Sequence, residues 1–110
     1  MNATIPTIQL SHPTGRISGT FQLPSSKSES NRALMIQAMS GGVVQLQNLS
    51  DAADTQTLIR LLQQRGDGEM NVGHAGTVMR FMAAYLAFQP VDTILTGSDR
   101  MLERPIGPLV

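Results

Sequence analysis

The chain has 110 residues, equal numbers of basic and acidic side chains (eight each) and no cysteine, so its formal net charge is zero. The balanced charge argues against nucleic acid and anionic membranes as partners, and the lack of cysteine excludes a disulfide framework and a thiolate metal site. Its start has no basic region and no long apolar run, and no stretch is long and apolar enough for a membrane span, so we expect a cytoplasmic protein without a signal peptide. His12 and His74 lie far apart in the sequence, so no metal site is expected.

The first part of the chain has the pattern of two short strands, at residues 7–10 and 16–23. Apolar or small residues alternate with polar ones in the second, which is the period of a half-buried strand. The cluster at residues 12–15, His-Pro-Thr-Gly, predicts a turn between them.

Pro24 ends the strand pattern, and a helix is expected to begin near Ser26 or Lys27 and to stop at Gly41-Gly42. Its apolar residues recur at four-residue spacing, so we expect the helix to be buried over much of its girth. The side chains expected to face the core are Leu34, Met35, Ile36, Ala38 and Met39.

The start of this helix combines hydroxyl groups with two cations. Lys27 is the only lysine of the chain, and Arg32 follows five residues later. A helix start presents unpaired N–H groups and a positive dipole end, so these residues favour an oxyanion site. Ser26 and Glu29 also fit an ordinary capping box. Helix capping does not explain the presence of Lys27, Ser28 and Arg32. Both interpretations remain open from the residues.

A strand is expected at residues 43–49, and Ser50 or Asp51 is expected to cap a second helix that runs to about Gln64. Asp51 and Asp54 fall in its first turn, where the helix dipole favours carboxylates, and we expect no further role for them. The leucines expected to face inward are Leu58, Leu61 and Leu62.

A polar turn at residues 66–68 and a short strand at 69–72 lead to a glycine-rich bend and an apolar helix at residues 78–88. Thr77 is expected to cap that helix. Arg80 would then lie in its first turn, where the dipole disfavours a cation. Either an anion between the two positive groups or a structural salt bridge would explain this placement.

A strand is expected at residues 92–95, followed by a segment that carries Arg100 and Arg104. Pro105 is suited to the first position of another helix, and the chain stops at Val110 within that pattern. Strands that alternate with helices indicate the α/β class. The glycine spacings of a P-loop and of a dinucleotide-binding fold are both absent.

Three stretches of the chain resemble the signatures of one family, the 5-enolpyruvylshikimate-3-phosphate synthases (3-phosphoshikimate 1-carboxyvinyltransferases) among the enolpyruvyl transferases. They are LPSSKSESNRALMIQAM, HAGTVMRFMAAYLA and LTGSDRMLERPIGPLV. The family usually has asparagine where this chain has His74. The sister family that acts on a uridine-diphosphate sugar lacks the SKSxSNR motif, so the resemblance favours the shikimate-pathway enzyme.

The resemblance implies a partial inside-out α/β barrel built from βαβαββ units. Residues 1–23 would belong with a C-terminal domain that lies outside this chain, and residues 24–110 would form an incomplete N-terminal domain. The family transfers the enolpyruvyl group of phosphoenolpyruvate to the 5-hydroxyl of shikimate 3-phosphate, in the biosynthesis of chorismate and aromatic amino acids, without a metal or organic cofactor. The chain would then be an inactive fragment whose main partner is the remainder of the same polypeptide.

The resemblance also assigns the two substrates to residues of these motifs, and it assigns no proton-transferring residue to this chain. The residues implied for shikimate 3-phosphate are Lys27, Ser28 and Arg32. Those implied for phosphoenolpyruvate are Lys27, Gly76 and Arg104, with Thr77 and Arg80 in support. The competing hypothesis is a small stand-alone domain that binds phosphorylated metabolites without catalysis.

Overall fold

The structure is a computed structural model, and it describes residues 4–64 and 68–109. Its elements, in chain order, are α1 (Lys27–Met39), α2 (Ala53–Gln63), β1 (Gly68–Asn71), α3 (Gly76–Leu86), β2 (Thr93–Thr96), α4 (Asp99–Glu103) and the short 3-10 helix η1 (Gly107–Leu109). Among these residues, no helix has the length and apolar character needed to cross a membrane.

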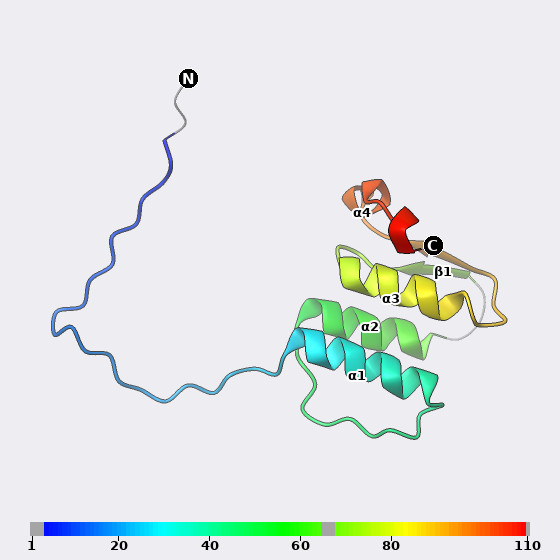
Figure 1. Cartoon of the computed structure of the whole chain (residues 1–110), viewed down its shortest axis with the longest axis horizontal. Coiled ribbons are helices and arrows are strands. Elements are labelled where there is room, and N and C mark those ends of the chain that lie inside the picture. Colours follow the sequence, from blue (N-terminus) through cyan, green and yellow to red (C-terminus); the bar gives the residue numbers. More distant parts are fainter. Residues whose placement is uncertain (1–3, 65–67, 110) are drawn as a thin grey trace.

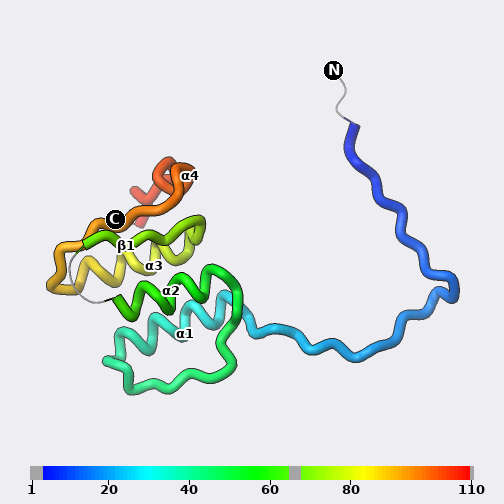
Figure 2. The backbone as a smooth tube through the Cα atoms, turned by 180° about the vertical axis from the view of Figure 1, so that it is seen from behind, coloured from blue at the N-terminus to red at the C-terminus, as the bar shows by residue number. Residues whose placement is uncertain are grey.

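The strands β1 and β2 form a parallel two-stranded sheet, and α3 is the crossover between them. Met70 pairs with Leu95 in its register. The helices α1, α2 and α3 lie side by side and begin at the same end of the molecule (Figures 1 and 2). Helix α3 packs on β2. Helix α2 contacts α1 on one side and α3 on the other. The α/β class is confirmed, whereas the barrel and its repeated unit stay predictions.

The core is made by one face of each helix and by β1. Leu58 and Leu61 of α2 are fully buried, and Leu62 is half-buried, so the sequence pattern identified the inward face of α2. The remaining buried apolar residues are Leu34, Met35, Met70, Val72, Ala75, Val78, Met82 and Met101. They form one cluster that packs the helices against one another and against β1.

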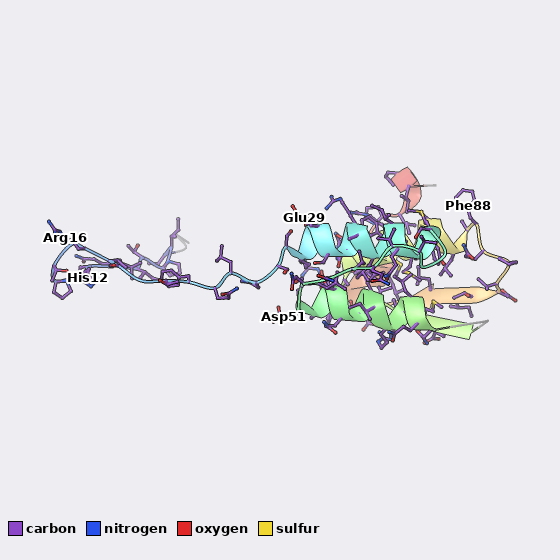
Figure 3. All side chains as sticks on the ribbon, turned by 90° about the horizontal axis from the view of Figure 1, so that it is seen from below. His12, Arg16, Glu29, Asp51 and Phe88 are labelled. Carbon is purple, nitrogen blue, oxygen red and sulfur yellow. The ribbon has the colours of Figure 1, made fainter. Side chains whose placement is uncertain are left out.

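The predicted strands at residues 7–10 and 16–23 are wrong for this chain, because residues 4–24 form an extended arm without strand pairing. Figure 3 shows His12 and Arg16 on this arm, well away from the helices. The predicted turn is present, since the Gly15 N–H donates to the His12 carbonyl at 3.2 Å and Gly15 has a φ of +64°. A strand needs a neighbour to pair its backbone groups, and no described segment lies beside the arm.

Helix α1 begins and ends where the sequence predicted, but it buries a narrower face. Its buried residues are Ser30, Asn31, Leu34 and Met35. Ile36 and Met39 are 56% and 68% exposed, so their prediction as core residues is wrong. Residues 43–49, predicted as a strand, have irregular structure instead.

Helix α2 starts later than predicted and lacks a side-chain cap, since Ala52 is its N-cap residue. Asp51 therefore precedes the helix, and Asp54 alone lies in its first turn. The Ser50 hydroxyl accepts a hydrogen bond from the Ala52 N–H at 3.1 Å, which orders the approach to the helix. The predicted turn at residues 66–68 lies mostly outside the described residues, and β1 is displaced by one residue from the predicted strand.

Helix α3 begins two residues earlier than predicted, at Gly76, with Ala75 as its N-cap residue. Thr77 is therefore inside the first turn and is not the capping residue. Arg80 is the fifth residue of the helix, beyond the first turn in which the sequence placed it.

The segment after β2 forms the short helix α4, which the sequence analysis did not predict. Ser98 caps it, because its hydroxyl accepts a hydrogen bond from the Met101 N–H at 3.3 Å. Pro105 follows this helix rather than opening another, and η1 begins at Gly107.

Candidate functional site

The start of α1 carries the first group of candidate residues. Ser26 is the N-cap residue, and its hydroxyl accepts a hydrogen bond from the Glu29 N–H at 3.3 Å, so the capping interpretation is correct for Ser26. Lys27 and Ser28 are the first two residues of the helix. Helix capping therefore occurs here, and it leaves both side chains available for another role.

Lys27 makes the one long-range ionic contact of this group. Its Nζ lies 3.1 Å from Oδ2 of Asp54, the second residue of α2. From the sequence, Asp54 was expected only to interact favourably with the dipole of its own helix. The structure adds a contact between side chains 27 residues apart in the chain.

Arg32 lies one turn further along α1. Its Nη1 donates a hydrogen bond to the Ser28 carbonyl at 3.1 Å, and the side chain is exposed. No carboxylate among the described residues forms an ion pair with this guanidinium, so it is available to an anionic ligand.

The second group of candidate residues is assembled by the loops after β1 and β2. Because the two strands are parallel, both loops leave the same edge of the sheet. The Ser98 N–H donates to the Gly73 carbonyl at 3.0 Å, and the Gly73 N–H donates to Oδ1 of Asn71 at 2.7 Å. Gly73 has a φ of +61°, which glycine adopts without strain. These bonds bring the segment that carries Arg100 and Arg104 to the start of α3.

The Arg104 guanidinium lies against Gly76. A Cβ added to Gly76 would overlap Nη1 of Arg104 and lie 3.0 Å from its Cζ. Arg80 lines the same small hollow as Gly76 and Arg104. Two arginines therefore line a hollow near the start of α3, whose dipole end is also positive. Like charges gathered in this way favour an anion as the missing partner.

A larger hollow adjoins this arrangement, with a volume of about 470 Å³. Its lining residues are His74, Ser98, Arg100, Met101 and Arg104, and none of them is a carboxylate. Arg100 forms no ion pair with any other described residue. The hollow is therefore suited to a negatively charged ligand and not to a cation.

The structure brings together some of the predicted site residues and keeps others apart. Gly76, Arg80 and Arg104 share one hollow, and Lys27, Ser28 and Arg32 share the first half of α1. Within residues 4–64 and 68–109, no hydrogen bond or ion pair joins the two groups. Both lie at the end of the molecule where α1 and α3 begin (Figure 1). Thr77 lies beside Gly76 in α3 without a capping bond.

Sequence reasoning missed Ser98 as a lining residue and Asp54 as the partner of Lys27. Ser98 had a usable signal, because a serine before a short polar run is a common helix N-cap. No sequence signal predicted the contact of Asp54 with Lys27, because no local pattern relates two residues that far apart in the chain.

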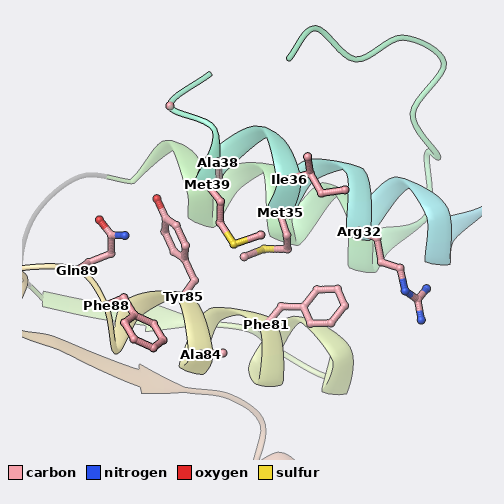
Figure 4. A pocket seen from close by; sticks show the side chains of 11 residues that line it. Arg32, Met35, Ile36, Ala38, Met39, Phe81, Ala84, Tyr85, Phe88 and Gln89 are labelled. Carbon is pink, nitrogen blue, oxygen red and sulfur yellow. The ribbon is translucent and has the colours of Figure 1, made fainter. Parts of the chain in front are cut away.

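Another hollow has a different character. It has a volume of about 740 Å³ and lies between the second halves of α1 and α3. Figure 4 shows Met35 and Met39 of α1 facing Phe81 and Tyr85 of α3 across it, with Arg32 at one end. Its walls are apolar, so it does not suit a phosphorylated ligand. No group of three or more potential metal-binding side chains occurs in the described part of the chain.

Comparison with known proteins identifies relatives over nearly the whole chain. The sequence model of the family EPSP synthase (3-phosphoshikimate 1-carboxyvinyltransferase) matches residues 11–69 and 63–110. The 3-phosphoshikimate 1-carboxyvinyltransferase of Bacteroides fragilis (strain YCH46) is 50% identical over 101 residues, which is 92% of this chain and 24% of the relative. No solved structure matches the chain.

Two further relatives carry the same name. The protein of Hamiltonella defensa is 38% identical over 123 residues, which is 89% of this chain and 29% of the relative. The protein of Sodalis glossinidius is 40% identical over 124 residues, which is 90% of this chain and 28% of the relative. The chain thus spans about a quarter of the length of the curated relatives that it matches.

Proposed function

The chain belongs to the EPSP synthase family, and from this premise we propose that it provides part of the substrate cleft of a 3-phosphoshikimate 1-carboxyvinyltransferase. The complete enzyme would transfer the enolpyruvyl group of phosphoenolpyruvate to the 5-hydroxyl of shikimate 3-phosphate and release phosphate, in the biosynthesis of chorismate. Residues 1–110 alone would lack this activity. The proteins named after this reaction are its relatives, and they support this assignment over the sister transferase that acts on a uridine-diphosphate sugar.

The observation that carries the proposal is the set of arginines near the start of α3 for which no described carboxylate forms an ion pair. The Arg104 guanidinium contacts Gly76, and Arg80 lines the same hollow as these two residues. Arg100 lines the adjoining hollow. Phosphoenolpyruvate has a phosphate and a carboxylate, both of which guanidinium groups bind through paired hydrogen bonds. Backbone N–H groups at a helix start add donors for an oxyanion.

We assign the substrates to residues as follows. Shikimate 3-phosphate would be bound by Lys27, Ser28 and Arg32. Phosphoenolpyruvate would be bound by Lys27, Gly76 and Arg104, with Thr77 and Arg80 in support. These groups hold charge and position the reactants, and we assign proton transfer to none of them. No cofactor is proposed.

We also propose a division of the chain between two domains. Residues 1–23, which include most of the arm, would belong with a C-terminal domain, and residues 24–110 would belong to an N-terminal domain of the inside-out barrel. The alternation of exposed apolar side chains along the described part of the arm supports this division, because such a pattern suits a strand that pairs elsewhere. A cytoplasmic location is part of the proposal.

The test uses the complete natural gene product that contains this sequence. We expect it to release phosphate only when phosphoenolpyruvate and shikimate 3-phosphate are both present. Lys27→Met should lower kcat/KM at least about 100-fold, because an ammonium that contacts two anions has no substitute. Binding of phosphorylated metabolites without phosphate release would instead support the hypothesis of a non-catalytic binding domain.

A further inference from the structure

Asp54 stands out because it pairs with the only lysine of the chain from another helix. Its Oδ2 lies 3.1 Å from Nζ of Lys27, and these two side chains are 30% and 52% exposed. An ion pair this exposed to solvent stabilises a fold little, because water screens the charges and the lysine loses side-chain entropy. A contribution to the stability of the fold therefore does not explain well why Lys27 and Asp54 are paired.

The carboxylate is the fixed member of this pair. Thr55, next to Asp54, donates a hydrogen bond from its hydroxyl to Oδ1 of Asn31 at 2.8 Å, and both side chains are fully buried. Three residues before the first residue of α2, the Ser50 N–H donates to the buried Ser30 hydroxyl at 2.8 Å. These two bonds hold the start of α2 against α1. Asp54 is thereby placed by buried neighbours, whereas Lys27 has a long and flexible side chain.

We infer that Asp54 is a positioning residue for Lys27, an inference that rests on the proposed function. A carboxylate near the site of two anionic substrates would repel them if it stood alone. Paired with Lys27, it uses one of the three donors of the ammonium group and leaves two for ligands. Asp54 thus holds the ammonium where the two helices begin, and the free donors can face one group of each substrate.

The alternative is that Asp54 has a purely structural role, in which its carboxylate interacts with the dipole at the first turn of α2. Such a role would alter thermal stability and would not depend on Lys27. A test must therefore measure the coupling between the two residues and compare Asp54 with another acid at the same helix start. Asp51 is the matched control, because it is exposed, lies three residues earlier and precedes the helix.

The experiment uses the complete natural gene product with the variants Asp54→Asn, Asp54→Glu and Asp51→Asn. For Asp54→Asn we expect a loss of about tenfold in kcat/KM for both substrates, with a melting temperature close to that of the unaltered protein. Asp54→Glu should recover most of the activity, because it restores a carboxylate within reach of Nζ. Asp51→Asn should leave both kinetic constants unchanged.

Coupling is measured by the dissociation constant of shikimate 3-phosphate. Asp54→Asn should weaken binding several-fold in the presence of Lys27 and should change it little in the Lys27→Met background. An equal effect in both backgrounds, or tighter binding by Asp54→Asn, would overturn the inference. Its failure is distinct from that of the proposed function, which fails if the unaltered protein has no transferase activity.

Discussion

Gly76 is a residue where an added methyl group would act on a neighbouring side chain and not on its own backbone. It is the first residue of α3, and its φ lies outside the left-handed region that favours glycine. An added Cβ would displace the Arg104 guanidinium, which is the mobile end of a long side chain. The effect of a substitution should therefore appear in ligand binding more than in folding.

For Gly76→Ala in the complete gene product, we expect phosphoenolpyruvate to bind about tenfold more weakly. The affinity for shikimate 3-phosphate should stay nearly unchanged, because its proposed ligands lie on α1. The free energy of unfolding should change by less than about 1 kcal/mol, since alanine suits a helix. Titration of each substrate and a thermal melt measure the three quantities.

Gly73→Ala is the control for this prediction. Gly73 has a φ of +61° and open space where a Cβ would lie, so its substitution should strain the backbone alone. We expect a loss of roughly 1 kcal/mol in stability without a preference between the substrates. If Gly76→Ala behaved like Gly73→Ala, Gly76 would be a structural glycine and would leave the proposed site.

At the scale of elements, buried hydrogen bonds hold the contact between α1 and α2, which is called the joint below. Asn31 and Thr55 are both almost fully buried, and their side chains bond to each other across the two helices at 2.8 Å. A buried polar group that loses its partner costs more than the bond itself contributes. The joint therefore fixes the relative position of the two helix starts, and with it the pair of Lys27 and Asp54.

We expect Thr55→Val to lower the free energy of unfolding by about 1–3 kcal/mol, because it leaves the Asn31 amide buried without its partner. The double variant Asn31→Leu/Thr55→Val should cost less than the sum of the two single changes, since it removes both polar groups. Urea unfolding of the complete gene product measures these values. The neighbouring exposed Gln56 supplies the control, Gln56→Ala, for which we expect a change within about 0.5 kcal/mol. Strict additivity of the two changes would contradict this account of the joint.

At the scale of the whole molecule, the described residues leave much apolar surface in contact with water. The hollow between α1 and α3 has apolar walls, and Phe88 at its far end is 89% exposed (Figures 3 and 4). The arm exposes a second, separate set of apolar residues, which includes Ile8. Exposed apolar patches of this kind mark surfaces that bind other apolar groups.

For residues 1–110 in isolation, we expect strong enhancement of the fluorescence of the hydrophobic dye ANS. Met39→Lys together with Phe88→Lys should reduce the signal at least by half, because both residues line the hollow. Ile8→Lys on the arm is the control and should reduce it little, since an extended segment offers the dye no concave surface. A signal that responds equally to both changes would show that the dye does not report on the hollow.

The sequence by itself determined what depends on neighbours within a few residues. The Ser26 cap and the Gly41-Gly42 stop bound α1, and the leucine spacing marked the inward face of α2. Short-range capping bonds and helical periodicity decide these features, so they can be read locally. The family motifs are local as well, which is why the family could be identified before the fold was known.

Only the tertiary structure decided which distant groups meet. The arm has a strand pattern, but strand formation needs a partner that the described residues do not supply. Arg104 reaches Gly76 because parallel strands release their loops at one edge of the sheet. Lys27 reaches Asp54 because buried bonds hold the starts of α1 and α2 together. Such contacts join residues far apart in the chain, and their energies depend on packing that no local pattern records.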